Sequence, residues 1–178
     1  MSPFEQFARW FEEAGRDERL ALATATSDGR PSVRMLLLKG FDEHGFVFFT
    51  GLTSRKGREL AENPRGALLF HWPGRQVRIE GRVDRVADEE VDVYWATRPL
   101  ASRRSAAASR QSEPIDSREA LEARVAAIGD DPSRPAHWGG FRLVPETFEF
   151  WQHRDDRLHD REHWTRTPDG WHVRRLQP

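Results

Sequence analysis

Residues 66–86, GALLFHWPGRQVRIEGRVDRV, decide the fold class because they predict two strands joined by a tight turn. In the second strand the apolar residues Val77, Ile79 and Val83 alternate with polar and charged ones. This period of two is typical of a strand with one buried face. Pro73-Gly74, between the two runs, supplies the turn. The segment therefore predicts an antiparallel hairpin that turns one face to the core.

Short runs of β type continue on both sides of this hairpin, and turn residues separate most of them. Further strands are predicted at Leu20 to Thr26, Val33 to Lys39, Phe46 to Thr50, Phe141 to Val144, Thr147 to Trp151, Arg157 to Arg166 and Trp171 to Leu176. Helices are predicted at Ser2 to Gly15, Ser54 to Glu62, Asp88 to Thr97 and Asp116 to Ile128. The pattern predicts a mainly β fold with peripheral helices (β+α), arranged as a small antiparallel barrel whose mouth or seam would bind a ligand.

The bulk composition excludes several classes of function. The 178 residues fit one domain, residues 1–178. A net charge of -1 argues against nucleic acid as a partner, and the absence of cysteine excludes disulfides, thiolate metal sites and a thiol nucleophile. The chain has no apolar run of about 18 residues and no basic-then-apolar leader, so we expect no membrane partner and a cytoplasmic location.

Three rare residues indicate where the chemistry lies. Only two of the 28 basic residues are lysines, Lys39 and Lys56, and Tyr94 is the single tyrosine beside 11 phenylalanines. A lysine ammonium is a compact charge on a flexible stem, which the planar guanidinium of arginine does not replace. The alternative interpretation is drift under a biased composition.

Two segments have the residue types of phosphate sites. In Thr53-Ser54-Arg55-Lys56-Gly57 a hydroxyl and two cations meet a predicted helix start, where unpaired N–H groups and the helix dipole favour phosphate. Tyr94 and Arg98 lie four residues apart on a predicted helix, hence on one face, and Ser102 follows just beyond Pro99. These side chains can form a second phosphate site.

A third cationic group lies near the C-terminus. Arg157, His159 and Arg161 alternate along a predicted strand, so they would line one face about 7 Å apart, with Phe150-Trp151 as an aromatic wall. The alternative interpretation is a solvated strand face. A zinc site at His159 and His163 is a different alternative, but a strand would place these residues about 13 Å apart, so it is disfavoured.

Together these motifs resemble the pyridoxamine 5'-phosphate oxidase family of flavoproteins. The matching stretches run in family order through nearly the whole chain, and they are RMLLLK (34–39), FVFFT (46–50), SRKG (54–57), NPRGALLFHW (63–72), RQVRIEG (75–81), YWATRPLAS (94–102), SRQS (109–112), EFWQ (149–152) and RLHDR (157–161).

The resemblance implies one FMN-binding split β-barrel domain that includes a C-terminal family segment at 138–178, and a homodimer with FMN at the subunit interface. The implied FMN site comprises Arg34, Met35, Leu36, Leu37, Leu38, Lys39, Phe49, Thr50, Arg55, Lys56, Gln76, Gln111, Ser112, Trp151 and Arg161. The implied substrate phosphate meets Lys39, Tyr94, Arg98 and Ser102, while Arg157 and His159 cover its pyridine ring and are the catalytic candidates. The implied reaction oxidises pyridoxamine or pyridoxine 5'-phosphate to pyridoxal 5'-phosphate, with O2 as acceptor and H2O2 as product.

The sequence also departs from the family pattern. Residues 103–108 read RRSAAA where the B6 oxidases have an Ile-Gly-Ala-Trp-like stretch, and Phe49 stands where tyrosine is common. The chain also begins almost directly at the first predicted helix. These departures resemble the phenazine-pathway flavin oxidases, which act on tricyclic substrates. Because Lys39, Tyr94, Arg98 and Ser102 retain the implied phosphate site, the B6 reaction is favoured over the phenazine-type reaction and over an FMN-binding protein without activity.

Overall fold

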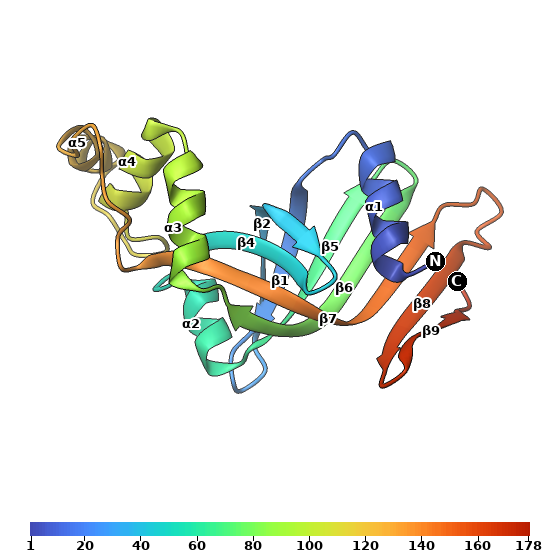
Figure 1. The fold of residues 1–178 in the computed structure, drawn as a ribbon. Helices are drawn as coiled ribbons and strands as arrows, with labels where there is room; N and C mark the ends of the chain where they lie inside the picture. The colour runs from blue at the N-terminus through green and yellow to red at the C-terminus, as the bar shows by residue number, and fades with distance from the viewer.

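One curled antiparallel sheet of nine strands forms the frame of the molecule, in a computed structural model that describes all 178 residues (Figure 1). The strand order is β2-β1-β5-β6-β7-β4-β3, and β8 and β9 extend the sheet from β7. The strands are β1 (Arg19–Ala25), β2 (Pro31–Leu37), β3 (Gly40–Asp42), β4 (Gly45–Gly51), β5 (Arg65–Trp72), β6 (Arg75–Arg85), β7 (Trp138–Gln152), β8 (Asp160–Thr167) and β9 (Gly170–Arg175). The helices are α1 (Pro3–Glu13), α2 (Arg55–Glu62), α3 (Asp88–Thr97), α4 (Leu100–Ala108) and α5 (Arg118–Ala126). The predicted mainly β architecture with peripheral helices is confirmed.

The β5–β6 hairpin forms as the sequence predicts. The two strands pair from Arg65 to Arg82 through a turn at Gly74, whose φ of +72° suits glycine. The three predicted apolar positions of β6 are all buried. A bulge follows between Glu80 and Gly81, and a Cβ on Gly81 would lie only 2.0 Å from the carbonyl oxygen of Val144. Glycine therefore permits the close approach of β6 and β7.

Phenylalanines dominate the main core. Phe7 of α1 is fully buried and makes edge-to-face contacts with Phe46 of β4 at 4.8 Å and Phe70 of β5 at 4.9 Å between ring centres. Burial of each such side chain contributes about 1.5–3 kcal/mol. Ser2 and Glu5 form the predicted capping box at the start of α1. This packing fixes α1 against β4 and β5.

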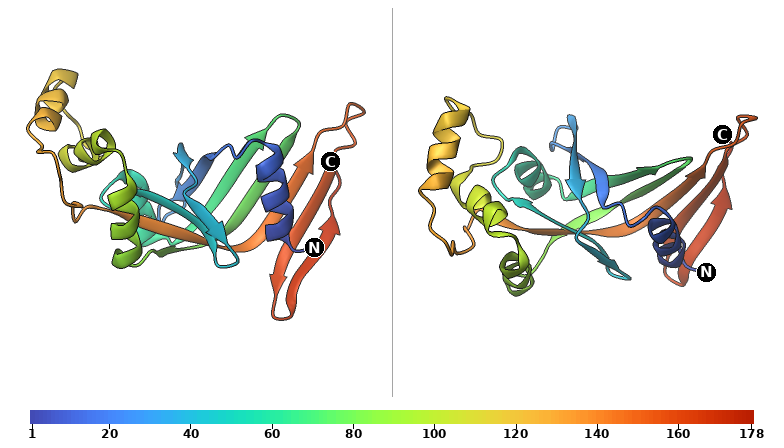
Figure 2. Two further views of the ribbon diagram at one scale, coloured as in Figure 1. Left: turned by 45° about the horizontal axis from the view of Figure 1, so that its top comes forward. Right: turned by 90° about the horizontal axis from the view of Figure 1, so that it is seen from above.

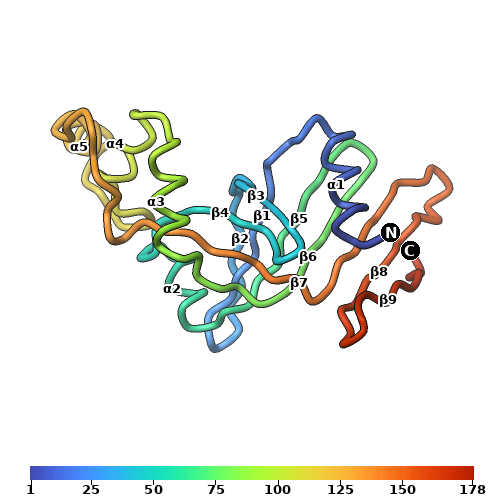
Figure 3. Tube along the Cα trace, viewed as in Figure 1, coloured from blue at the N-terminus to red at the C-terminus, as the bar shows by residue number.

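Helices α3, α4 and α5 gather at the end of the sheet opposite α1 (Figure 1). Val91 and Trp95 of α3 pack with Val47, Val86 and Trp138 in a second apolar cluster. In Figures 2 and 3, α3, α4 and α5 lie at one end of the molecule, and α1, β8 and β9 lie at the other. No helix in the structure has the length and apolar character that crossing a bilayer requires.

The helix α4 was missed by the sequence prediction. The predicted helix over Asp88 to Thr97 stops before Arg98-Pro99, but Pro99 is also the N-cap residue of α4. Proline has no N–H to donate, which costs nothing at a helix start, so one proline can end one helix and open the next. The helix α3 begins at Asp88, with Ala87 as N-cap and no side-chain cap.

Two strand predictions in the last third were wrong as well. The segments predicted as 141–144 and 147–151 form one strand, β7, because Pro145 sits at the bulge opposite Gly81, where a strand tolerates proline. The strand predicted to begin at Arg157 begins at Asp160. Arg157 has a φ of +66° and donates its N–H to the carbonyl of Arg154, so it belongs to a turn.

Candidate functional site

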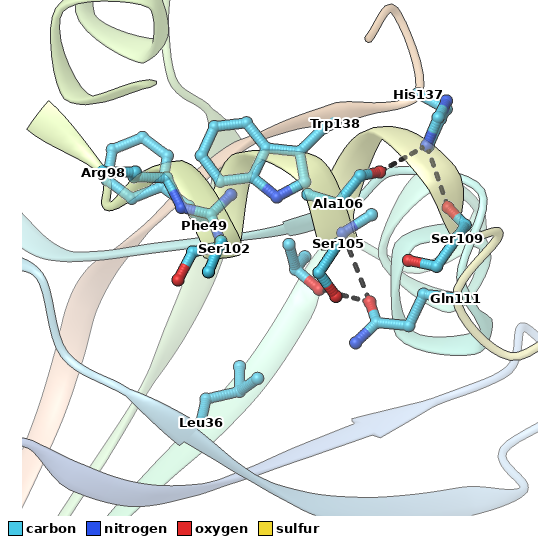
Figure 4. Close-up of a pocket in the computed structure, with 13 residues that line it drawn as sticks. Leu36, Phe49, Arg98, Ser102, Ser105, Ala106, Ser109, Gln111, His137 and Trp138 are labelled. Carbon is cyan, nitrogen blue, oxygen red and sulfur yellow. Dashed lines mark hydrogen bonds between the residues drawn. The ribbon is translucent and has the colours of Figure 1, made fainter. Parts of the chain in front are cut away.

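A cavity of 460 Å³ opens between β2, β4 and α4 (Figure 4). It brings together predicted cofactor and substrate residues from distant parts of the chain. Its lining residues are Leu36, Phe49, Thr50, Gly51, Arg98, Ala101, Ser102, Ser105, Ala106, Ser109, Gln111, His137 and Trp138.

Arg98 is the main cation of this cavity. Its guanidinium lies 4.5 Å from the ring centre of Trp138, and its Nη1 is buried without a hydrogen-bond partner. Burial lowers the pKa of Arg98, and the nearby Tyr94 opposes that shift. An unpaired buried donor of this kind is costly unless a ligand accepts from it. Arg98 is therefore arranged to receive an anion.

An aromatic stack holds Tyr94 beside Arg98. The ring of Tyr94 lies on Phe49 at 4.0 Å between centres and 9° between planes, and Phe49 in turn stacks on Trp138 at 5.6 Å. Ser102 lines the same cavity from α4. Of the four predicted phosphate ligands, the structure thus brings Tyr94, Arg98 and Ser102 together.

Lys39 lies elsewhere. Its Nζ donates to Glu18 at 2.5 Å, and the side chain borders a different hollow with Phe11, Arg16 and Phe41. Its role at the substrate phosphate stays a prediction.

A second hollow, of 370 Å³, adjoins the cavity and shares Leu36 and Gln111 with it. It is lined by Ser32, Val33, Arg34, Met35, Leu36, Arg55, Lys56, Gln111 and Ser112. All of these except Ser32 and Val33 are predicted FMN ligands. Leu37 is half exposed on the same face of β2 as Val33 and Met35 but does not line the hollow, and Leu38 is buried in the main core.

Lys56 is a buried lysine at the start of α2. Its Nζ donates to Thr50 Oγ1 and Gln111 Oε1 at 3.0 Å and to Ser54 Oγ at 3.3 Å. Burial lowers the pKa of Lys56 to about 8, Arg34 adds to the shift, and Glu59 opposes it. The hydrogen-bond partners of Lys56 are all neutral, so none of them neutralises its positive charge, and a bound anion could do so.

Arg34 and Arg55, in contrast, share a carboxylate. Glu59 of α2 accepts from Arg55 Nε at 2.8 Å and from Arg34 Nη2 at 3.3 Å. Although its burial opposes the shift, hydrogen bonds from Ser32, Thr24 and Arg55 hold the pKa of Glu59 at about 2. The three cations and one carboxylate leave a net charge of +2 around the hollow.

The remaining predicted residues form a separate group on β6, β7 and β8. Gln76, Trp151 and Arg161 are direct neighbours across these three strands. Arg161 donates to buried Glu149 at 2.8 Å, and the ring of His159 lies 4.7 Å from that of Trp151. Of the predicted aromatic wall of Phe150 and Trp151, only Trp151 lies beside His159, because Phe150 is buried in the main core on the other face of β7.

The predicted alternation of Arg157, His159 and Arg161 along one strand face is wrong. Arg157 and His159 lie in the loop before β8, because the turn at Arg157 interrupts the extended backbone. His159 Nδ1 accepts the backbone N–H of Arg154 at 3.1 Å. In the neutral ring the proton is then on Nε2, which is left to donate.

One chain keeps the two groups of predicted residues apart. Figure 1 and both views of Figure 2 place α3 and α4 at one end of the sheet and β8 at the other. The residues Gln76, Trp151, Arg157, His159 and Arg161 line neither the cavity nor the adjoining hollow.

In the unusual segment 103–108, two residues line the cavity and two others form ion pairs with the loop after α5. Ser105 and Ala106 line the cavity, whereas Arg103 pairs with Asp131 at 2.8 Å and Arg104 pairs with Asp130. The two arginines thus fasten α4 to the loop after α5. The cavity side of α4 consists of small side chains.

Sequence reasoning missed His137, Trp138 and Glu59. The glycines after Trp138 were a usable signal, because a Cβ on Gly140 would lie 2.8 Å from the ring of Phe49. The spacing of Arg55 and Glu59, four residues apart on a helix, was another. His137 donates from Nε2 toward the carbonyls of Ala106 and Ser109. No local sequence pattern predicts this contact.

Two family models match this chain. The model described as "Pyridoxamine 5'-phosphate oxidase" matches residues 7–130, and "Pyridoxine 5'-phosphate oxidase C-terminal dimerisation region" matches residues 138–178. The pyridoxine/pyridoxamine 5'-phosphate oxidase of Gluconobacter oxydans is 56% identical over 99% of this chain and 94% of its own length. The protein of the same name from Burkholderia multivorans is 56% identical over 99% of this chain and 89% of its own.

Solved structures agree on the fold. PhzG from Burkholderia lata, in complex with tetrahydrophenazine-1-carboxylic acid, aligns with a TM-score of 0.94 at 38% identity and covers 99% of this chain and 93% of its own. A pyridoxamine 5'-phosphate oxidase-related, FMN binding protein from Nostoc punctiforme aligns with a TM-score of 0.83 at 19% identity and covers 100% of this chain and 98% of its own. At this identity the similarity is one of fold alone. The fold is the predicted split barrel.

Proposed function

Because the chain belongs to the pyridoxamine 5'-phosphate oxidase family and its cofactor is FMN, we propose that it oxidises pyridoxamine or pyridoxine 5'-phosphate to pyridoxal 5'-phosphate. O2 is the proposed acceptor and H2O2 the product. The amine route also consumes water and releases ammonia. Bound FMN supplies the two-electron redox chemistry. The protein has to hold both molecules and place the reacting C4' carbon against the flavin.

The hollow around Lys56 fits the phosphate of FMN. Lys56, Arg34 and Arg55 converge at the start of α2, which Ser54 caps through the N–H of Gly57. A phosphate monoester carries about -1.5 to -2 charges near neutral pH, which matches the net charge of +2. Gln111 turns its carbonyl to Lys56 and Thr50, so its amide N–H groups are left for the flavin.

The unpaired Arg98 Nη1 is the observation that carries the choice of substrate. Arg98 lines the cavity next to the hollow, with Ser102 in the same lining and Tyr94 beside it. Two separate anion sites suit a reaction in which the cofactor and the substrate each carry a phosphate. A substrate without an anionic group would leave this guanidinium unsatisfied.

We further propose a homodimer with FMN at the subunit interface. The C-terminal segment matches a dimerisation region, and β2 exposes Val33, Met35 and Leu37 by 70%, 64% and 48% beside the hollow. Three such side chains in a row are unfavourable in water and favour burial by a partner. A second copy would supply the residues that one chain keeps away from the cavity, namely Gln76, Trp151, Arg157, His159 and Arg161.

Anaerobic flavin reduction tests the proposed reaction. Pyridoxamine or pyridoxine 5'-phosphate is expected to bleach the flavin absorbance without O2, and admission of O2 should restore it with release of H2O2. Unphosphorylated pyridoxamine at the same concentration is the matched control and should bleach far more slowly. Protein that binds FMN but is bleached by neither phosphate ester would contradict the proposal.

A phenazine-type oxidation is the second candidate, and the fold match to PhzG together with the small side chains Ser105 and Ala106 favours it. The 56% identity to the B6 oxidases exceeds the 38% to PhzG, so we rank it second. Bleaching by a dihydrophenazine carboxylic acid, with none by the B6 phosphates, would reverse this order.

A further inference from the structure

Glu59 is a buried carboxylate just below the proposed FMN phosphate site. It is 4% exposed, and both of its oxygens are in use. Oε1 accepts from Arg55, while Oε2 accepts from Arg34, from Ser32 at 2.6 Å and from Thr24. A buried carboxylate is costly unless donors satisfy it, and here four do so.

This carboxylate joins two cations that come from different elements. Arg34 is on the edge strand β2 and Arg55 is in the first turn of α2, and no other acidic group pairs with either of them. Lys56 faces only the neutral groups of Thr50, Ser54 and Gln111, and its charged neighbours are Arg34 and Glu59. Without Glu59 the like charges would repel and Arg55, which is more than half exposed, would turn to solvent.

We infer that Glu59 is a positioning residue for the FMN phosphate, which holds Arg34 and Arg55 in place before the phosphate arrives and leaves Lys56 with neutral hydrogen-bond partners only. The inference rests on the proposed position of FMN. Glu59 does not touch the ligand, so it acts through the two arginines. Groups ordered before binding lose less freedom on binding, which raises affinity.

Two effects of removing the carboxylate oppose each other. A neutral residue at position 59 raises the net charge around the hollow from +2 to +3, which attracts phosphate more strongly. It also loosens the arginines, because the amide of Glu59→Gln would turn an N–H group toward the donors of one arginine. Arg34 keeps its hydrogen bonds to Leu22 O at 3.1 Å and Thr24 Oγ1 at 2.6 Å, so Arg55, which bonds only to Glu59, is affected most. The hollow is open to water, where an added charge has little effect, so the loss of order dominates.

Flavin titrations of the cofactor-free full chain test the inference. In Glu59→Gln the FMN dissociation constant is expected to rise about tenfold or more, as for loss of a charge-assisted hydrogen bond, while that of riboflavin stays unchanged. Glu62→Gln, on the same helix and exposed, is the matched control and should behave as wild type. FMN affinity should also fall with rising pH around the Lys56 pKa of about 8, and this midpoint should move lower in Glu59→Gln because Glu59 no longer supports the ammonium.

Each outcome decides something. A folded Glu59→Gln with wild-type FMN affinity and midpoint, or with equal losses for FMN and riboflavin, would overturn the inference. If this variant does not fold, Glu59→Asp replaces it: its carboxylate keeps the charge but is too short to reach both arginines, so FMN affinity should fall and the midpoint should stay. Wild-type affinity in Glu59→Asp would overturn the inference too. A wild-type protein that binds FMN no better than riboflavin would instead refute the proposed phosphate site.

Discussion

Replacement of Arg98 by alanine should selectively weaken use of phosphorylated substrates. Arg98 lines the cavity and its Nη1 has no hydrogen-bond partner, so a phosphate that reached the guanidinium would gain a charge-assisted hydrogen bond from it. Such a bond contributes about 1.5–3 kcal/mol, which corresponds to about 10- to 150-fold in kcat/KM. Arg98 also lies over Trp138 and Trp95, at 4.5 and 5.3 Å from their ring centres. Loss of those contacts lowers stability by about 0.5–2 kcal/mol and affects all substrates alike.

The ratio of kcat/KM for pyridoxamine 5'-phosphate to that for pyridoxamine separates the two effects. In Arg98→Ala this ratio should fall by about 10- to 150-fold, and a thermal melt reports the stability loss separately. Arg103→Ala is the matched control, because Arg103 also has a buried unpaired nitrogen but pairs with Asp131 and does not line the cavity. An unchanged ratio in folded Arg98→Ala would refute the proposed phosphate site.

Two further predictions concern the cofactor hollow and the interface. Because the pKa of Lys56 is lowered to about 8, its ammonium is lost as the pH rises, so the FMN affinity of wild type should decline above about pH 8. In Lys56→Met the FMN affinity should be weaker and independent of pH. A wild-type FMN affinity that does not change between pH 7 and 10 would count against this role. Met35→Glu places a charge on the exposed apolar row of β2, so it should shift the protein from dimer to monomer and lower FMN occupancy, as measured by light scattering and flavin absorbance. Arg30→Glu, at an exposed residue at the end of the preceding turn, is the control. A dimer that persists in Met35→Glu would exclude β2 from the interface.

The features that local chemistry determines could be predicted from sequence. Alternation of Val77, Ile79 and Val83 with polar residues needs only the strand period, and the Pro73-Gly74 turn needs only its own torsion angles. The two phosphate motifs were likewise local, since each spans fewer than ten residues, although the second runs from α3 into the unpredicted α4. Their convergence beside one cavity was implied by the family resemblance and not by these local patterns.

The features that depend on long-range contacts could not be predicted in this way. Pro145 breaks a strand in isolation, but Gly81 across the sheet gives it a bulge to occupy. Glu59 serves Arg34 from another element, a pairing that only the folded chain creates. The split of the predicted site into two separate groups also escapes sequence reasoning, because motif order along a chain carries no information on which end of a sheet a residue reaches.

A purified heterodimer tests the shared site most directly. One chain carries Arg98→Ala and the other His159→Ala, with different affinity tags so that only mixed dimers are recovered. If each site takes Arg98 from one chain and His159 from the other, one site collects both substitutions and the other collects none. The heterodimer should then have about half of the wild-type activity per dimer, while both parent homodimers are impaired. A heterodimer as impaired as its parents would show that each chain builds its site alone, and would contradict the account.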